Sequence, residues 1–389
     1  MKKVCIITGT RAEYGLLKPL ITKIEKDDDL ELQLIVTGMH LSPEFGLTYK
    51  EIEEDGFNIT EKIEILLSSD SSVGISKSMG LAMVSFSECF ARIKSDLVIV
   101  LGDRYEIFSA VSAASVMRIP IAHLHGGETT EGAFDEAFRH SITKMSFLHF
   151  TSTEEYRNRV IQLGEDPSRV LNVGAIGIES IKTLDLLSRT ELEESIGFQL
   201  NSKYALVTFH PVTLENHCSQ TQFQNLLDAL DHFSDLKIIF TKANADTDGR
   251  IINKMIDNYV DNNRGKAIAF TSMGQLRYLS AMKYSNLVVG NSSSGILETP
   301  SFGIPTVNIG DRQRGRIQSH SVINCEPTKL DIVNSIKKSL EKGFVDRIRN
   351  IRNPYGSGNV SEKIINEVKN LLTHPVDLKK SFYNTELER

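Results

Sequence analysis

The sequence predicts an α/β protein built from two doubly wound halves. Short runs of Val, Ile and Leu alternate with longer segments whose apolar residues recur at helical spacing, which is typical of a parallel sheet covered by helices on both faces. This alternation occurs before and after a cluster of glycines at residues 173–177. The length of 389 residues suits two or three domains. We therefore expect two Rossmann-like domains that face one cleft, with polar groups after the strands directed into it.

The expected strands are short and almost wholly apolar, because parallel strands are buried on both faces. In the first half they are Val4–Thr8, Leu32–Thr37, Leu97–Leu101, Pro120–Leu124 and Leu148–Thr151. In the second half they are Ala205–Phe209, Lys237–Thr241, Ala267–Phe270, Leu287–Val289 and Thr306–Ile309. The helices expected in the first half are Leu16–Lys26, Ser76–Lys94, Ile107–Met117 and Phe134–Lys144.

Turn signals suggest where the domains begin and end. An N-terminal domain is expected over residues 1–173 and a C-terminal domain over residues 174–358. Residues 359–374 carry a helical pattern after a turn-rich hinge at residues 353–358, and we expect this helix to pack back on the N-terminal domain. Residues 375–389 lack such a pattern and are expected to form a tail.

Composition and charge exclude several classes of function. The chain carries 44 Lys and Arg against 50 Asp and Glu, a net charge of −6, which gives no electrostatic basis for nucleic-acid binding. The 4 cysteines are far apart and form no CxxC pair, so we expect a reduced, cytoplasmic protein without a disulfide framework or zinc site. The apolar run after Met-Lys-Lys is too short for a signal peptide or a membrane span, so no membrane association is expected.

Two polar motifs follow expected strands of the first half. Residues 9–15 (GTRAEYG) open a helix, where Arg11 and backbone N–H groups can bind phosphate or carboxylate, although an ordinary turn would look the same. This motif matches neither GxGxxG nor a Walker A loop, so no nicotinamide cofactor or P-loop nucleotide is expected. Asp103 and Arg104 follow another strand and fit either a helix cap with its counter-ion or a carboxylate that acts on a substrate.

The next expected strand leads into residues 123–128 (HLHGGE). Alternation along an extended segment puts His123 and His125 on one side. No further ligand completes a recognised metal-binding spacing, so we expect no metal and interpret His125 and Glu128 as parts of a catalytic loop. Asp135 begins a helix that carries Arg139 at i+4, which fits either a surface ion pair or a carboxylate directed into the cleft.

The second half has polar residues in corresponding places. His210 follows one strand and Asn244 follows the next, although a buried, hydrogen-bonded histidine and a capped turn would explain them without a ligand. Arg312 lies in a segment with three arginines (GDRQRGR) after a later strand, where the alternative is a solvated basic loop.

The strongest local signal is residues 290–298 (GNSSSGILE), which lead from a strand into a helix. Ser292, Ser293 and exposed N–H groups at a helix start can cradle a diphosphate, and the alternative is a serine-rich helix cap. Glu298 lies about one and a half turns into that helix and suits the two hydroxyls of a ribose. Because polar clusters follow most of the expected strands, the sequence predicts a nucleotide ligand with a diphosphate and a sugar-like group.

These motifs occur together, in the same order, in a known family. GTRAEYG, GDRYE, HLHGGE, DEAFRHSITK, FHPVT, GNSSSGILE and GDRQRGR resemble the hydrolysing UDP-N-acetylglucosamine 2-epimerases, up to about residue 370. The chain looks like the bacterial sialic-acid-pathway branch and is similar to the epimerase half of the animal bifunctional epimerase/kinase. The resemblance implies the GT-B-like architecture of one class of nucleotide-sugar glycosyltransferases, no cofactor, and a homodimer or homotetramer.

The resemblance also implies a reaction, the conversion of UDP-N-acetylglucosamine and water to N-acetylmannosamine and UDP. The C2 proton is not next to a carbonyl in the sugar ring, so direct abstraction is difficult. Family members first expel UDP by anti elimination, which leaves 2-acetamidoglucal, and water then adds with protonation of C2 on the opposite face. This route needs an acid and a base at C2 and cations for the leaving diphosphate.

The family's functional residues carry over position by position. Asp103 and Asp135 match the catalytic carboxylates, and Glu128 is a third candidate. His210 would contact the diphosphate as UDP leaves, and Glu298 would bind the ribose. The other residues that match UDP-binding positions are Arg11, Arg104, Asn244, Ser292, Ser293 and Arg312.

One departure and three alternatives stay open. Many relatives carry Glu where this chain has His125, and the two side chains differ in charge and by about two pKa units, so the acid or base at this point is His125 or Glu128. The same chemistry on UDP-N,N'-diacetylbacillosamine, which feeds legionaminic acid, would depend on contacts to C4 and C6 of the sugar. A GT-B glycosyltransferase or a non-catalytic nucleotide-sugar sensor would not need the carboxylates around Asp103 and Asp135.

Overall fold

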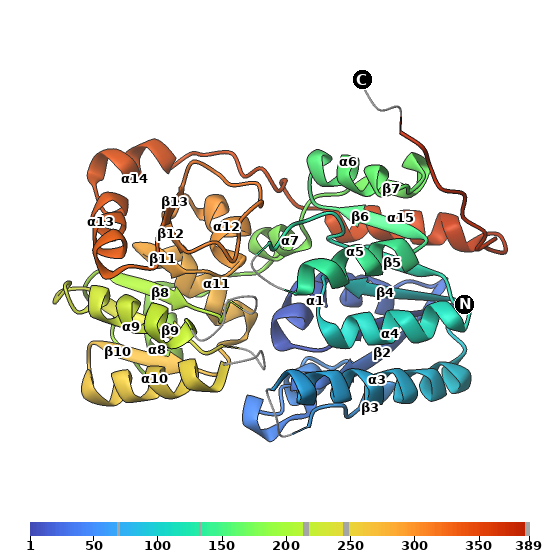
Figure 1. The fold of residues 1–389 in the computed structure, drawn as a ribbon, viewed down its shortest axis with the longest axis horizontal. Coiled ribbons are helices and arrows are strands. Elements are labelled where there is room, and N and C mark those ends of the chain that lie inside the picture. Colours follow the sequence, from blue (N-terminus) through green and yellow to red (C-terminus); the bar gives the residue numbers. More distant parts are fainter. Residues whose placement is uncertain (68–70, 132–133, 213–217, 244–248, 386–389) are drawn as a thin grey trace. The chain divides into compact units, whose positions relative to one another are not determined.

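The chain folds into two compact units. The computed structural model describes residues 1–67, 71–131, 134–212, 218–243 and 249–385 (Figure 1). Unit 1 comprises residues 1–128, 135–180 and 355–389, and unit 2 comprises residues 129–134 and 181–354. None of the helices in the described ranges is long and apolar enough to cross a membrane.

Unit 1 is built on a parallel sheet with the strand order β3-β2-β1-β4-β5-β6-β7. Its strands are β1 (Lys2–Thr8), β2 (Leu30–Thr37), β3 (Glu61–Ile63), β4 (Leu97–Leu101), β5 (Ile121–Leu124), β6 (Leu148–Thr151) and β7 (Val170–Asn172). The helices are α1 (Arg11–Glu25), α2 (Tyr49–Glu54), α3 (Ser72–Ile93), α4 (Tyr105–Val116), α5 (Asp135–Met145), α6 (Glu154–Gln162), α7 (Ile176–Thr183) and α15 (Val360–Leu372). Short 3₁₀ turns are η1 (Gly38–Leu41), η2 (Pro43–Phe45) and η3 (Pro167–Arg169).

Helices cover both faces of this sheet, as Figure 1 shows. Val4 and Ile6 of β1 lie in a core with α1 and α15, whereas the alternate residues Cys5 and Ile7 lie in a core with α3 and α4. All four side chains are fully buried, which explains why the strands are continuous apolar runs.

Unit 2 repeats this design with the strand order β10-β9-β8-β11-β12-β13. The strands are β8 (Tyr204–Thr208), β9 (Lys237–Thr241), β10 (Ala267–Phe270), β11 (Leu287–Gly290), β12 (Thr306–Ile309) and β13 (Val322–Cys325). The helices are α8 (Arg189–Ile196), α9 (Ser219–Leu230), α10 (Gly249–Asn262), α11 (Gly274–Tyr284), α12 (Ser294–Leu297), the 3₁₀ turn η4 (Thr299–Phe302), α13 (Lys329–Ser339) and α14 (Lys342–Ile348). One face packs on α9, α10 and α13, and the other on α8 and α11.

The predicted α/β class with two doubly wound parallel sheets is confirmed. The short strands β3, β7 and β13 are not among the expected strands. All three are edge strands, and β3 (Glu-Lys-Ile) carries charged side chains because only part of an edge strand is buried.

The two units divide the chain at other residues than the sequence predicts. Residues 174–180 belong to unit 1, because the Ala175 N–H donates to the Tyr355 carbonyl (2.9 Å) and Ile176 is fully buried in its core. Residues 129–134 belong to unit 2, where Thr129 lies against Gly315. The expected tail is part of unit 1, and its contacts are described below.

Gly290 shows how closely the central strands of unit 2 approach. Its backbone has φ +136°, and a Cβ atom added there would lie 1.9 Å from the Thr208 carbonyl oxygen on the neighbouring strand β8. Only glycine fits this position, because either β8 or β11 would have to move to admit a side chain.

We predict that Gly290→Ala lowers the free energy of unfolding by about 3 kcal/mol or more, because strain and a backbone clash add. The matched control is Gly310→Ala, whose φ of +69° is strained but whose Cβ would meet nothing within 4 Å. This control should cost only about 1 kcal/mol. Urea unfolding of both variants measures the difference, and equal costs would contradict the clash.

Candidate functional site

Each sheet has a topological switch point, between β1 and β4 in unit 1 and between β8 and β11 in unit 2. At these points consecutive crossovers leave in opposite directions, and ligands of doubly wound sheets bind beyond the carboxyl ends of the strands there. Asp103 follows β4 and Arg11 follows β1, while His210 follows β8 and Ser292 follows β11. The fold therefore places the predicted residues at the two positions where a ligand is expected.

In unit 1, the loop after β4 is tied to helix α5 by an ion pair between Asp103 and Arg139. Arg139 is buried and also donates from Nη1 to the His125 carbonyl (3.1 Å), so it joins the loops after β4 and β5. Asp135 begins α5, one helical turn before Arg139. Because residues at i and i+4 lie on one helix face, this ion pair brings Asp103 to the face of α5 that carries Asp135.

His123 holds the same loop through hydrogen bonds of its two ring nitrogens. Its Nε2 lies 2.8 Å from the carbonyl of Gly102, the residue before Asp103, and its Nδ1 lies 3.1 Å from the Thr143 hydroxyl on α5. Since a carbonyl only accepts, Nε2 carries the proton. Burial lowers the pKa of His123 to about 3, so the ring stays neutral and acts as a fixed hydrogen-bond donor.

His125 and Glu128 form a buried pair, with Nδ1 3.0 Å from Oε1. The Ile176 N–H at the start of α7 donates to His125 Nε2 (3.3 Å), so the hydrogen-bond network assigns the ring proton to Nδ1, facing Glu128. The Ser152 hydroxyl donates to the same carboxylate (2.7 Å). His125 has φ +65°, which few non-glycine residues adopt, so these contacts hold a strained turn.

The loop after β1 differs from the sequence prediction. The Gly9 and Thr10 N–H groups, which were expected to face an anion, donate to the Glu13 carboxylate (2.7 and 3.2 Å). Burial, and next the charge of Glu106, raise the pKa of Glu13 to about 8, against the opposing effect of Arg104. Arg104 donates from Nε to Glu106 (2.6 Å). Two buried carboxylates and one guanidinium thus lie at the switch point of unit 1.

In unit 2, Asn291 joins the loops after β8 and β11. Its side chain accepts from the His210 N–H (2.7 Å) and donates to the His210 carbonyl (2.8 Å). Its own carbonyl accepts from Arg312 Nη1 (3.0 Å) and Gln313 Nε2 (2.9 Å). Asn291 therefore fixes the backbone around His210 through its side chain and binds the basic loop of Arg312 through its backbone carbonyl.

The serine segment also differs in detail from the expected long helix. Helix α12 has only four residues, and Glu298 follows it at the start of η4. Ser292 and Ser293 precede α12 and are half-buried. Burial raises the pKa of Glu298 to about 7, although a hydrogen bond from Ser294 opposes this shift. Glu298 Oε2 is buried and has no hydrogen-bond partner among the described residues, so it can accept bonds from a ligand.

Several functional candidates were not singled out from the sequence. Glu13 and Glu106 end the GTRAE and GDRYE motifs, and the sequence signal for them is their place shortly after apolar strands, whereas their burial is visible only in the structure. Asn291 stands inside the serine motif, but only the folded structure shows its bond to His210. Asn244 lies outside the described residues. Within the described ranges, no group of three or more His, Cys, Asp or Glu side chains could hold a metal ion.

Two parallel α/β units, each with polar side chains at its switch point, define the class of two-domain proteins with a GT-B-like fold. A family model described as UDP-N-acetylglucosamine 2-epimerase matches residues 22–369, and the chain belongs to this family. The resemblance seen in the motifs is thus confirmed, and the chain is an enzyme of this family by descent.

Relatives of known name are similar over nearly the whole chain. The GDP/UDP-N,N'-diacetylbacillosamine 2-epimerase (hydrolyzing) of Campylobacter jejuni is 48% identical over 85% of this chain and 86% of its own length. Polysialic acid biosynthesis protein P7 of Escherichia coli is 41% identical over 99% of this chain and 98% of its own length. A UDP-N-acetylglucosamine 2-epimerase of Neisseria meningitidis serogroup B is 32% identical over 88% of this chain and 89% of its own length.

Solved structures share the fold. A co-structure of Staphylococcus aureus MnaA with UDP aligns with a TM-score of 0.80 at 19% identity, covering 99% of this chain and 100% of that one. The UDP-GlcNAc 2-epimerase of Neisseria meningitidis bound to UDP-GlcNAc aligns with a TM-score of 0.79 at 20% identity, covering 95% and 100%.

The raised pKa of Glu298 predicts a pH-dependent stability. The folded protein holds this proton more tightly than the unfolded chain, so stability falls as pH rises from about 4.5 through about 7. A Glu298→Gln variant lacks this loss. Its free energy of unfolding relative to that of the parent should therefore rise by on the order of 2–3 kcal/mol from pH 5 to pH 8. Urea unfolding at both pH values measures it. A constant difference between the two proteins would contradict an uncharged native Glu298 at pH 5.

Proposed function

We propose that this protein is a hydrolysing 2-epimerase of a UDP-linked 2-acetamido sugar. The observation that supports this most directly is the Asp103–Arg139 ion pair, which holds one carboxylate beside the helix that begins with a second carboxylate, Asp135. A reaction that removes a proton from C2 on one face and returns one on the other needs two such groups. Membership of the 2-epimerase family supports the same reaction.

The proposed reaction has two steps. In the first, a carboxylate takes the C2 proton, the anomeric C–O bond breaks, and UDP leaves with those electrons, giving a 2-acetamidoglucal. In the second, water gives a proton to a carboxylate and adds its oxygen to C1, while an acid protonates C2 on the face opposite to the one that lost its proton. For UDP-N-acetylglucosamine the sum is UDP-N-acetylglucosamine and water to N-acetylmannosamine and UDP. We assign the proton transfers to Asp103 and Asp135, with Arg139 as a positioning residue.

His125 and Glu128 have a different part in this proposal. Both ring nitrogens of His125 bind groups of unit 1, and Glu128 accepts from His125 and Ser152. We assign the pair to holding the loop after β5, on which the Arg139 contact depends. A direct proton transfer by Glu128 would require this pair to separate.

Unit 2 would bind the nucleotide. His210 and Arg312, whose loops are joined by Asn291, would face the diphosphate with Ser292 and Ser293. Glu298 would accept the ribose hydroxyls, since its Oε2 is buried without a partner from the described residues. The remaining nucleotide-side candidates are Arg11, Arg104 and Asn244.

Two sugars are candidates for the substrate. The sequence motifs favoured UDP-N-acetylglucosamine, the substrate named in the relative from Neisseria meningitidis serogroup B at 32% identity. The 48% identity to the Campylobacter jejuni enzyme, whose name gives GDP/UDP-N,N'-diacetylbacillosamine, favours the diacetyl sugar instead. The polysialic acid protein P7, at 41%, supports the former through its pathway. We therefore propose the diacetyl sugar as the first substrate to test.

The test is proton NMR of the purified protein with each UDP sugar in D2O, without added metal. We expect release of UDP together with a free 2-epimeric sugar that carries deuterium at C2, because the proton lost in elimination is replaced from solvent. A UDP-linked epimer without UDP release would move the protein to non-hydrolysing chemistry. No turnover of either sugar would contradict the proposed function.

The matched variant is Asp103→Asn. We expect turnover to fall at least about 100-fold, the usual contribution of a general acid or base. UDP affinity, measured by calorimetry, should stay within about twofold, because Asp103 is assigned to proton transfer and is not among the proposed nucleotide contacts. An equal loss of UDP binding would contradict this division of roles.

We also propose that the protein forms a homodimer through the outer face of α3. Val73, Leu81 and Val84 are 64%, 43% and 59% exposed on this helix. Lys77 and Glu88, both exposed, lie at equal distances from the midpoint between residues 82 and 83, as do Leu81 and Val84. Two α3 helices packed antiparallel about that midpoint would bury the apolar stripe and pair each Lys77 with Glu88 of the other copy.

This interface predicts that Leu81→Glu converts the dimer to a monomer, because two unpaired carboxylates would be buried at its centre. The control is Leu330→Glu, at a leucine of α13 in unit 2 that is 69% exposed. Light scattering with size-exclusion chromatography gives the masses. A parent protein of monomer mass, or a Leu81→Glu variant that stays dimeric, would contradict this surface.

A further inference from the structure

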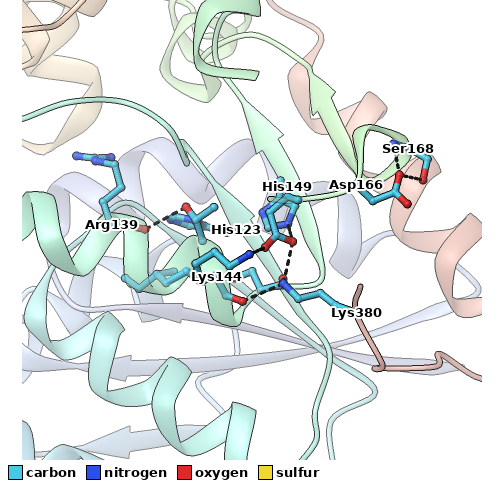
Figure 2. Close-up of polar contacts among 11 residues, drawn as sticks. His123, Arg139, Lys144, His149, Asp166, Ser168 and Lys380 are labelled. Carbon is cyan, nitrogen blue, oxygen red and sulfur yellow. Dashed lines mark hydrogen bonds and ion pairs between the residues drawn. The ribbon is translucent and has the colours of Figure 1, made fainter. Parts of the chain in front are cut away.

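The C-terminal segment forms a strap along unit 1, here defined as residues 379–383. Lys380 of this strap donates from Nζ to the carbonyls of Lys144 (2.9 Å) and Ser146 (2.6 Å) and to the Glu165 carboxylate (2.8 Å). Figure 2 shows Lys380 beside Lys144 and His149. The sequence predicted only a tail in this region, because none of these partners is near Lys380 in the chain.

Glu165 is the buried centre of this cluster. Its side chain is 1% exposed and accepts from Lys144 Nζ (2.6 Å) and His149 Nε2 (3.1 Å) as well as from Lys380. Burial alone would raise the pKa of Glu165, but the hydrogen bonds from His149, Lys144 and Lys380 outweigh it and lower the pKa to about 2. The carboxylate is therefore charged, and the strap supplies one of its cations.

Apolar and backbone contacts hold the strap on either side of Lys380. The Tyr383 N–H donates to the Gly164 carbonyl (2.9 Å). The Phe382 ring lies so close to Gly164 that a Cβ added there would be 2.3 Å from it. Lys144 Nζ lies 5.1 Å from the centre of the same ring. These contacts hold the strap on unit 1, so its position does not depend on one ion pair.

The strap binds unit 1 at the C-terminal end of helix α5. The last carbonyls of a helix have no partner within it, and a cation there also interacts favourably with the helix dipole. The carbonyls that Lys380 binds belong to Lys144, in the last turn of α5, and to Ser146, one residue beyond its end. Lys380 therefore caps α5 from 234 and 236 residues away in the chain.

The other end of α5 carries the proposed chemistry. Asp135 is its first residue, and Arg139 in its second turn holds Asp103. Between the two ends, Ile142 is fully buried and Phe138 stacks on Phe108 with ring centres 4.8 Å apart. Rigid secondary elements can couple distant groups, so we expect a change at the capped end of this eleven-residue helix to shift the carboxylate end as well.

We propose that Lys380 is a positioning residue for the reaction, which acts by capping and fixing α5 so that Asp135 and the Asp103–Arg139 pair keep their geometry. This inference rests on the proposed function. It makes the strap a part of the catalytic unit, although the strap contributes no group to the substrate.

The experiment compares Lys380→Met with Lys379→Met, the same change at the adjacent, exposed lysine. We expect kcat of Lys380→Met to fall about tenfold, because a misplacement of about 1 Å can cost about 100-fold and a smaller one costs less. KM, the UDP affinity and the circular dichroism spectrum should match the parent. Lys380→Arg, which keeps a cation and donors, should recover most of kcat, and Lys379→Met should be unchanged. Hydrogen exchange of α5 amides should rise in Lys380→Met alone.

An active parent whose kcat is the same in Lys380→Met and Lys379→Met would overturn the proposal. A parallel loss of kcat, UDP affinity and helical signal would also overturn it, because Lys380 would then only stabilise the fold. A parent without turnover on either UDP sugar would contradict the proposed function instead. In that case the exchange data decide alone: faster exchange of α5 in Lys380→Met supports the cap, and unchanged exchange overturns it.

Discussion

The geometry of unit 1 depends on the buried guanidinium of Arg139. This side chain is 3% exposed, and a charge removed from water in this way is strongly destabilising unless a carboxylate meets it. Asp103 is that carboxylate, and the His125 carbonyl accepts a second bond. Because one planar group must satisfy both partners, the loops after β4 and β5 and the helix α5 keep one fixed relation before any ligand binds. Preorganised charge of this kind costs no reorganisation during a reaction.

The sequence predicts the sheets well and the polar contacts poorly, for a physical reason. Buried parallel strands are continuous apolar runs, so β4 and β6 can be recognised with their bounds, and glycines mark the loops that follow. The contacts within the candidate site join residues 36 and 81 apart in the chain, namely Arg139 with Asp103 and His210 with Asn291. The strap contact of Lys380 with Glu165 joins residues 215 apart. From the sequence, Asp135 was a candidate ion-pair partner of Arg139, because the spacing of residues in a helix reveals only neighbours such as i and i+4.

Buried carboxylates divide into two kinds in this protein. Glu13 and Glu298 lie at the switch points of the two sheets, and burial raises the pKa of each, to about 8 and about 7. Glu165 is buried as well, but three nitrogen donors lower its pKa to about 2. A carboxylate whose charge is already neutralised by the protein serves the fold. Glu13 accepts the Gly9 and Thr10 N–H groups, whereas Glu298 Oε2 has no partner among the described residues, so Glu298 would gain most from a ligand that donates hydrogen bonds.

The course of the chain adds a constraint on how this site forms. Unit 2 is built almost entirely from one continuous segment, residues 181–354, whereas unit 1 needs residues 355–385 to finish its core. Val360, Ile364 and Val368 of α15 pack in the same apolar cluster as β1 and α1. The cap on α5 comes from still later, at Lys380. Domains fold as units when their contacts are local, so unit 2 can close first during synthesis. The proposed catalytic helix then receives its cap from Lys380 after the proposed nucleotide-binding unit has formed.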